Sequence, residues 1–281
     1  MASQIIIKEW FGRLCNNLTQ ITHAYHLAEK TRSRLVLPVH TALDTAALVQ
    51  VSDFSEGQPI KADVKDNFFF TEHPLFNEFP IDFERRRSIL RIILPSLIDG
   101  YISRLSDRAS ADVPDLVVHI RSGDVFHRIN NPTLYATPNF VQPPLSFYKR
   151  IIREGDFQSI QIVAEDKQNP CIDALLEWDK RIFFRKQKPL ADISLLLAAK
   201  NLVIGYGTFA FTWALASHRL EALYSQLIPA AVFGTIHDGD LRGTRIRAYM
   251  VQNYIKTGEW SCSNEQLALM LNHSEDDIKK L

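Results

Sequence analysis

The segment Leu116–Asp124 constrains this chain more than any other. It reads Leu-Val-Val-His-Ile-Arg-Ser-Gly-Asp, so three apolar residues lead directly into His, Arg, Gly and Asp side chains. The apolar run predicts a buried strand over Leu116–Ile120. A strand of this kind delivers its polar end to the carboxyl edge of a sheet, where ligands bind in open α/β proteins. We therefore expect a binding site at this strand end.

The elements predicted around this strand follow an alternating order. Further strands are expected at 160–164, 181–184 and 202–204, and helices at 145–154, 170–178, 191–200 and 209–217. The beginning of the chain reads as a strand, a glycine-containing loop, a helix and a second strand that ends near Pro38. Such alternation is typical of doubly wound α/β domains. We predict a Rossmann-like domain over 1–110, a second over 111–260, and a helical tail over 261–281.

Charge and apolar content exclude several classes of partner. The chain has 32 basic and 32 acidic residues, which argues against nucleic acid or an anionic membrane surface as a partner. No apolar stretch approaches the length of a membrane span, and the first residues do not resemble a signal peptide. The three cysteines lie far apart, without the spacing of a metal site. We expect a cytoplasmic protein with reduced thiols.

The predicted strand end carries side chains suited to a phosphorylated ligand. His119 and Arg121 are two residues apart, so strand alternation places them on one face. Arg121 offers a planar fork of donors that matches diphosphate oxygens. His119 could contact a base, a phosphate or a sugar hydroxyl, and Asp124 could orient Arg121 or act as a base. The alternative is an ion pair between Arg121 and Asp124 beside a buried, hydrogen-bonded His119.

Three other predicted strand ends also carry polar or small residues. They are Glu165-Asp166, the segment Gly205–Thr208, and the early loop Gly12–Asn17. Several such ends in one chain indicate a shared cleft. Thr208 and the early loop each lie at the start of a predicted helix, where an anion is favoured. For the early loop a second interpretation stays open, in which Gly12 only turns the chain and Asn16 only caps the helix.

Other chemistries find little support in the sequence. There is no P-loop and no nucleophile elbow. The segment Gly205–Ala210 fits a relaxed dinucleotide fingerprint, but no strand with an acidic end follows at the usual distance. Asp238-Gly239-Asp240 reads as a turn rather than a metal site. We predict a helix over 83–101 and interpret Arg85-Arg86-Arg87 as its solvated face. The alternative is that these arginines bind the phosphates of a ligand. Pro95 predicts a kink or a break in this helix.

Taken together, these motifs resemble the fucosyltransferase superfamily, closest to its α-1,2 type and more distantly to α-1,6 and protein O-fucosyltransferases. The similarity spans roughly residues 5 to 220 and follows the family's order. Its motifs are Gly12-Arg13-Leu14-Cys15-Asn16-Asn17, His119-Ile120-Arg121-Ser122-Gly123-Asp124, Ala164-Glu165-Asp166, and Asp192 through Gly207-Thr208-Phe209-Ala210-Phe211-Thr212-Trp213.

The resemblance implies a GT-B fold, in which two Rossmann-type domains face each other across a cleft. It implies inverting, metal-independent transfer of fucose from GDP-fucose to a glycan hydroxyl, with the GDP-sugar as substrate and no further cofactor. Arg121 would hold the β-phosphate and stabilise the departing GDP, and Asp124 is a candidate base with Glu165. The donor-binding residues implied or expected are Gly12, Arg13, Asn16, His119, Arg121, Glu165, Asp192, Gly207, Thr208 and Phe209.

The chain departs from the family pattern at a few positions. Ser122 stands where a second arginine is expected, Cys15 replaces a glycine, and Asn17 replaces a glutamine. The aromatic pair of the last motif is reduced to Trp213. Two alternatives therefore stand beside a fucosyltransferase. One is a glycosyltransferase with another nucleotide-sugar donor, and the other is a non-catalytic nucleotide-sugar or glycan-binding module of the same fold.

Overall fold

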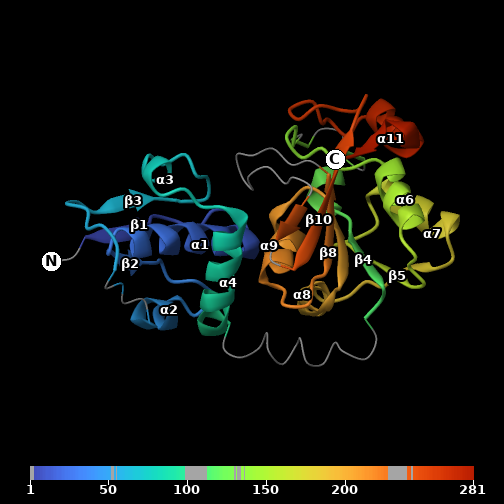
Figure 1. Ribbon diagram of the computed structural model, residues 1–281. Coiled ribbons are helices and arrows are strands. Elements are labelled where there is room, and N and C mark those ends of the chain that lie inside the picture. The colour runs from blue at the N-terminus through green and yellow to red at the C-terminus, as the bar shows by residue number, and fades with distance from the viewer. Residues whose placement is uncertain are drawn as a thin grey trace. The chain divides into compact units, whose positions relative to one another are not determined.

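The computed structural model describes residues 3–51, 54, 56–98, 113–129, 131, 134–135, 137–226, 239–241 and 243–281. These residues form two compact units, one on each side of the gap between 98 and 113 (Figure 1). The predicted boundary at residue 110 lies outside the described residues. Within them, no helix combines the length and the apolar character needed to cross a membrane.

The first unit is built on a three-stranded parallel sheet of order β2-β1-β3. Helix α1 follows β1 directly and packs against it, as the strand–loop–helix–strand pattern predicts. The long helix α4 packs on α1 and α2. The elements are β1 (Gln4–Ile7), α1 (Leu14–Lys30), β2 (Arg34–Val36), α2 (Thr45–Val51), β3 (Val64–Asp66), α3 (Leu75–Glu78) and α4 (Phe83–Leu97).

Helix α4 differs from its sequence interpretation in two ways. Helix α4 continues through Pro95 to Leu97, so the proline does not divide the described helix, and residues 99–101 of the predicted helix lie outside the described residues. Arg86 and Arg87 are each only 6% exposed, so this part of the arginine run is not a solvated face. Arg85 instead forms an ion pair with Glu29 of α1. Burial lowers the pKa of Arg86 to about 10, and the nearby Asp82 opposes that shift.

The second unit contains a larger sheet whose strand order is that of the Rossmann fold. The order β6-β5-β4-β7-β8-β10 is parallel throughout, and β11 and β9 pair antiparallel with β10. The chain reverses its direction across the sheet between β4 and β7. That place is the topological switch point, where ligands bind in this fold class. The parallel strands are β4 (Leu116–His119), β5 (Ile160–Val163), β6 (Ile182–Phe184), β7 (Asn201–Ile204), β8 (Ala222–Gln226) and β10 (Thr244–Val251).

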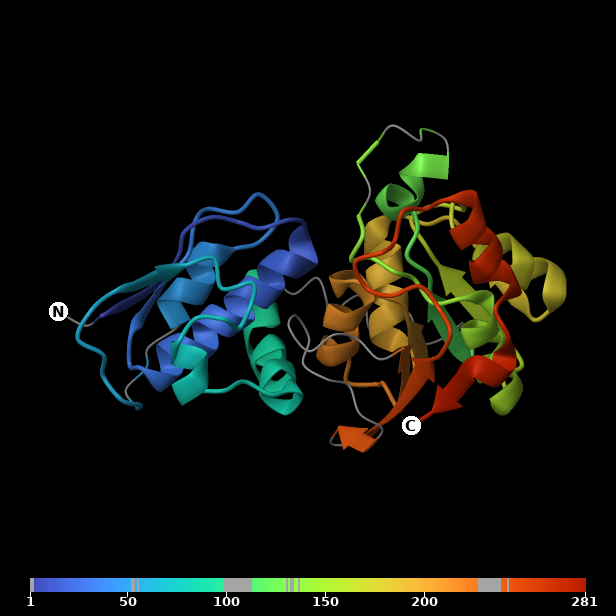
Figure 2. The same cartoon turned by 90° about the horizontal axis from the view of Figure 1, so that it is seen from above.

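Helices cover both faces of this sheet, with α6, α7 and α11 on one side and α8 and α9 on the other (Figures 1 and 2). Because both faces are covered, β4 and β5 are buried at every residue, and all of their residues except His119 and Gln161 are apolar. The helices are η1 (Gly123–Ile129, a 3-10 helix), α6 (Leu145–Glu154), α7 (Pro170–Trp178), α8 (Pro189–Ala198), α9 (Thr208–Ala216) and α11 (Asn264–Asn272).

The end of the chain is only partly the helical tail that the sequence predicts. Ser263 is the N-cap of α11 and accepts a hydrogen bond from the amide of Gln266, as expected. A 3-10 turn, η2 (Glu275–Asp277), and a strand, β11 (Ile278–Lys280), then follow instead of a second helix. The strand forms because the free edge of β10 supplies hydrogen-bonding partners. Another short strand, β9 (Gly239–Leu241), contains part of the predicted acidic turn, whose Asp238 lies outside the described residues.

Residues Phe68–Phe70 are also not the strand that three consecutive phenylalanines indicate. Strand β3 ends at Asp66, and Phe68 has a φ of 57°, which is incompatible with an extended strand. Phe68 is fully buried, and its carbonyl oxygen lies 2.8 Å from Nδ1 of the buried His23. The tertiary contacts of the loop therefore override the local β-propensity.

Candidate functional site

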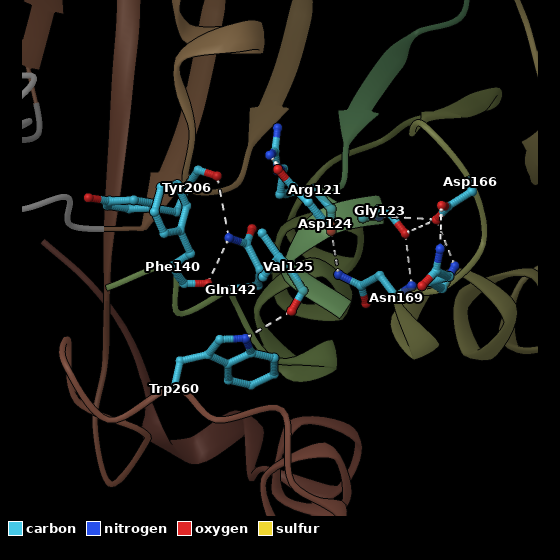
Figure 3. A network of polar contacts seen from close by, with 12 residues as sticks. Arg121, Gly123, Asp124, Val125, Phe140, Gln142, Asp166, Asn169, Tyr206 and Trp260 are labelled. Carbon is cyan, nitrogen blue, oxygen red and sulfur yellow. Dashed lines mark hydrogen bonds and ion pairs between the residues drawn. The ribbon is translucent and has the colours of Figure 1, made fainter. Parts of the chain in front are cut away.

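The end of β4 presents His119 and Arg121 next to the switch point of the sheet. Arg121 forms an ion pair with Asp124 of η1, as the alternative interpretation expects (Figure 3). That interpretation also expects a hydrogen-bonded His119, but Nδ1 of this buried residue has no hydrogen-bond partner among the described residues. Burial, with a smaller contribution from the charge of Arg121, lowers the pKa of His119 to about 3. His119 is therefore neutral at physiological pH.

Arg121 also keeps hydrogen-bonding capacity for a ligand. A guanidinium has five N–H donors, and its bond to Asp124 uses Nη2. Nε of Arg121 is buried and has no partner among the described residues. Buried polar atoms are usually satisfied in folded proteins, so these atoms of His119 and Arg121 give the strand end hydrogen-bonding capacity for a polar ligand.

Ser122 lies in a buried cluster behind this strand end rather than in the site. Its hydroxyl donates to Oδ1 of Asp166 and accepts from the backbone N–H of Asn169, at 2.9 Å in the latter case. The amides of Gly123 and Gln168 donate to the same carboxylate, at 3.2 and 2.9 Å. Burial opposes ionisation of Asp166, but these hydrogen bonds outweigh it and lower its pKa. The position of the family's second arginine thus serves to hold the loop after β4.

Asn169 connects this cluster to Arg121. Its side chain donates to the carbonyl oxygen of Arg121 at 2.9 Å and accepts from the amide of Cys171 at 3.0 Å, which caps helix α7 (Figure 3). We refer to Ser122, Asp166 and Asn169 as the bracing cluster. Asn169 is not among the predicted site residues, although an asparagine directly before a proline is a recognisable start signal for a helix.

The ends of β4 and β7 meet at the switch point. The rings of His119 and Phe209 lie 5.7 Å apart between centroids, so the predicted residues of two distant motifs are in contact. Gly207, with a φ of 143°, is the N-cap of α9 and provides no side-chain cap for the first-turn amides. Thr208 and Phe209 form the first turn of that helix, where backbone N–H groups and the helix dipole favour an anion.

The long loop between η1 and α6 also reaches this region. Gln142 is fully buried, and its amide nitrogen donates to the carbonyl oxygens of Phe140 and Tyr206, at 3.1 and 3.4 Å. The rings of Phe140 and Tyr206 pack edge-on, 5.5 Å apart (Figure 3). Neither Gln142 nor Phe140 was among the predicted site residues, because no local pattern shows that this loop lies against the end of β7.

The remaining predicted residues of this unit lie near the same edge of the sheet. Asp192 is in the first turn of α8, which packs on α9, and burial raises its pKa to about 6. Glu165 is exposed at the end of β5, and a Cβ on Gly123 would lie 2.6 Å from its carboxylate. Gly123 has a φ of 63°, so the turn and the close approach both favour glycine.

The early loop of the first unit has the conformation that its glycine permits. Gly12 has a φ of 69°, and a Cβ there would lie 2.2 Å from the side-chain amide of Asn16. Helix α1 begins at Leu14 with Arg13 as its N-cap, so Asn16 lies inside the helix and the interpretation of Asn16 as its cap is wrong. Arg13 is exposed and Asn16 half-buried at this helix start.

Comparisons with known proteins give distant similarities only. No protein-family model matches the chain, and neither does any curated protein. Among solved structures, the chain is similar to POFUT1 in complex with GDP-fucose, at 14% identity and a TM-score of 0.46, over 79% of this chain and 98% of that one. It is also similar to the NodZ α-1,6-fucosyltransferase soaked with GDP-fucose, at 11% identity and a TM-score of 0.45, over 77% and 93% of the two chains.

A third similarity is to the E. coli ADP-heptose LPS heptosyltransferase II, at 10% identity and a TM-score of 0.37, over 96% of this chain and 98% of that one.

Proposed function

We propose that this protein is an inverting, metal-independent glycosyltransferase that transfers fucose from GDP-fucose to a glycan hydroxyl. The observation that carries the proposal is the pair of unsatisfied buried atoms, Nδ1 of His119 and Nε of Arg121, at the switch point of a Rossmann-ordered sheet. The start of α9, whose N-cap residue is Gly207, lies beside them. Arginine donors and helix N-terminal amides are the groups that bind phosphate oxygens in proteins.

In the proposed reaction, an acceptor hydroxyl attacks the anomeric carbon of the donor. The bond from that carbon to the diphosphate oxygen breaks, and the electron pair leaves with GDP. Arg121 and the first amides of α9 offset the negative charge that grows on the diphosphate. Asp124 is bound to Arg121 and orients it, which leaves Glu165 as the exposed carboxylate for general-base work.

The donor nucleoside is assigned to Asp192 and His119. Asp192 is buried at the start of α8, where a carboxylate can accept hydrogen bonds from a guanine edge. The neutral imidazole of His119 can exchange a hydrogen bond with the ligand without adding charge. We assign Gly12, Arg13 and Asn16 of the first unit to donor binding, as the family resemblance implies.

The test is nucleotide binding by the Arg121→Ala variant. Isothermal titration with GDP should show affinity at least about tenfold weaker than wild type, because a charge-assisted hydrogen bond of roughly 1.5–3 kcal/mol is lost. Arg150→Ala is the matched control, since Arg150 is an exposed arginine of the same unit that pairs with Glu154. Equal GDP affinity in wild type and Arg121→Ala would refute the phosphate role.

A thermal-shift panel with and without EDTA distinguishes the alternatives. Stabilisation by GDP and GDP-fucose that EDTA does not change supports the proposal. Stronger stabilisation by UDP or UDP-sugars would reject the fucose donor in favour of another nucleotide sugar. A protein that GDP-fucose stabilises, but that neither hydrolyses nor transfers it, would be the non-catalytic binding module.

A further inference from the structure

Four aromatic side chains gather at the carboxyl edge of the first unit's sheet. Trp10 and Phe11 follow β1, and Phe69 and Phe70 follow β3, so two parallel strands deliver them to one edge. Phe11 lies 4.7 Å from Phe69 and 6.3 Å from Phe70, measured between ring centroids. We call these four residues the aromatic cluster.

The aromatic cluster is open to solvent. Phe11 is 44% exposed and Trp10 and Phe70 are half-buried, while Phe69 lies beneath them at 5%. Exposed aromatic rings that group together at the ligand-binding edge of a parallel sheet mark an interaction site more often than rings that are scattered singly.

Two buried amides of α1 hold the loops that carry the cluster. The side chain of Gln20, which is fully buried, accepts from the amide of Phe11 at 2.9 Å. Its nitrogen donates to the carbonyl oxygens of Glu9 and Asn67, at 2.9 and 2.7 Å, so one side chain joins the loops after β1 and β3. A ring fixed in this way loses little conformational entropy when a ligand binds.

Asn17 extends this arrangement to the loop after β2. Its nitrogen donates to the carbonyl oxygen of Phe11 at 3.1 Å, and its oxygen accepts from Nε2 of His40 at 3.1 Å. His40 packs edge-on against Trp10, with ring centroids 5.1 Å apart. The loops after all three strands are therefore held by residues three apart on one helix.

The charges of these loops indicate an uncharged partner. Lys8 and Arg13 are balanced by Glu9, Asp66 and Glu72, so the edge has no excess of positive charge for nucleic acid or an anionic membrane. A pyranose ring has an apolar face of C–H groups that packs on aromatic rings, and hydroxyls at its rim that need polar partners. Aromatic walls with a few polar groups meet both requirements.

We infer that the aromatic cluster is a saccharide-binding surface, on which Phe11 and Phe70 pack against the apolar face of a sugar ring of the acceptor. This inference deepens the proposed function and rests on it for the role of the sugar as acceptor. The packing itself does not depend on the donor site.

The test is binding to a printed glycan microarray without any donor present, for wild type and the Phe11→Ala/Phe70→Ala double variant. Wild type should bind one class of glycan, and the double variant should bind it about tenfold more weakly, because two ring contacts of roughly 0.5–1.5 kcal/mol each are lost. Phe54→Ala is the matched control, since Phe54 packs on Tyr25 farther along α1. Phe11→Trp should retain binding.

GDP titration of the same variants separates this inference from the proposed function. The double variant should bind GDP as wild type does. If wild type binds glycans through Phe11 but does not bind GDP, the proposed function fails and the saccharide-binding surface stands. Absence of glycan binding by wild type, or equal binding by the double variant, overturns the inference. So does a self-association of wild type that sedimentation shows to be abolished in the double variant, because the cluster would then bind a second copy of the chain.

Discussion

Replacement of Asn169 by alanine should separate the stability of the second unit from its affinity for the donor. Alanine removes the acceptor for the Cys171 amide, an N-cap loss of about 1 kcal/mol. It also removes the donor to the Arg121 carbonyl, which costs about 1–3 kcal/mol for an unsatisfied buried acceptor. The backbone bond from Asn169 to Ser122 survives the change. We expect the free energy of unfolding to fall by roughly 2–4 kcal/mol.

Asn169→Ser is the informative companion variant. Serine is a good N-cap but is too short to reach the Arg121 carbonyl, so it should recover about 1 kcal/mol of the loss. Urea unfolding followed by tryptophan emission is a suitable assay, because Trp178, Trp213 and Trp260 all lie in the second unit.

Affinity for GDP should follow a different pattern from stability. Both variants lack the contact that holds the Arg121 backbone, so both should bind GDP with similarly weakened affinity in a titration. Equal unfolding free energies for Ala and Ser would contradict the capping role of Asn169. GDP affinity at the wild-type level in both variants would contradict its role in positioning Arg121.

Three further changes test other parts of the site. Gly207→Ala should lower the free energy of unfolding by about 1–3 kcal/mol, because alanine is strained at a φ of 143°. No atom lies within 4 Å of the added Cβ, so backbone strain is the whole expected effect. Wild-type stability in urea would contradict this. Ser122→Arg should reduce soluble, folded protein in circular dichroism rather than improve GDP binding, because the position is 1% exposed and bound to Asp166; a folded variant with tighter GDP binding would disprove it. The pKa of His119 is about 3 in the folded protein and about 6.5 in the unfolded chain. Between these values the unfolded chain binds more protons, so the free energy of unfolding of the wild type falls as the pH drops below about 6.5. His119→Gln should lose less stability over that range, and identical pH profiles would refute the assignment.

Local sequence patterns predicted the elements of the second unit closely from β4 to α9, but they did not predict β8 and β10. Helices α6 and α7 have the expected bounds, and β5 and β7 differ by a residue at one end. These strands are mostly apolar because the sheet is covered on both faces, and short apolar segments can be recognised in the sequence. The clustering of polar residues after β4, β5 and β7 predicted one shared edge, and the contact between His119 and Phe209 agrees with it for β4 and β7.

Local patterns were wrong where distant segments decide the conformation. Phe68–Phe70 has a strong β-propensity, but the contact with His23 of α1 places Phe68 in a left-handed conformation. Residues Ile278–Lys280 form a strand because the edge of β10 is available to them. The burial of Arg86 likewise depends on packing that the arginine run does not reveal.

The sequence by itself determined the type and order of the elements from β4 to α9 and the residues at the strand ends among them, because apolar periodicity and turn chemistry are local. Only the tertiary structure decided what those residues do. Ser122 faces Asp166, which lies 44 residues away, and Asn17 and Gln20 hold loops from three strands. Hydrogen-bond partners across such separations are set by strand order and register, and no local pattern encodes them. The same strand order places β4 beside β7 and so brings the end of Leu116–Asp124 against the start of α9.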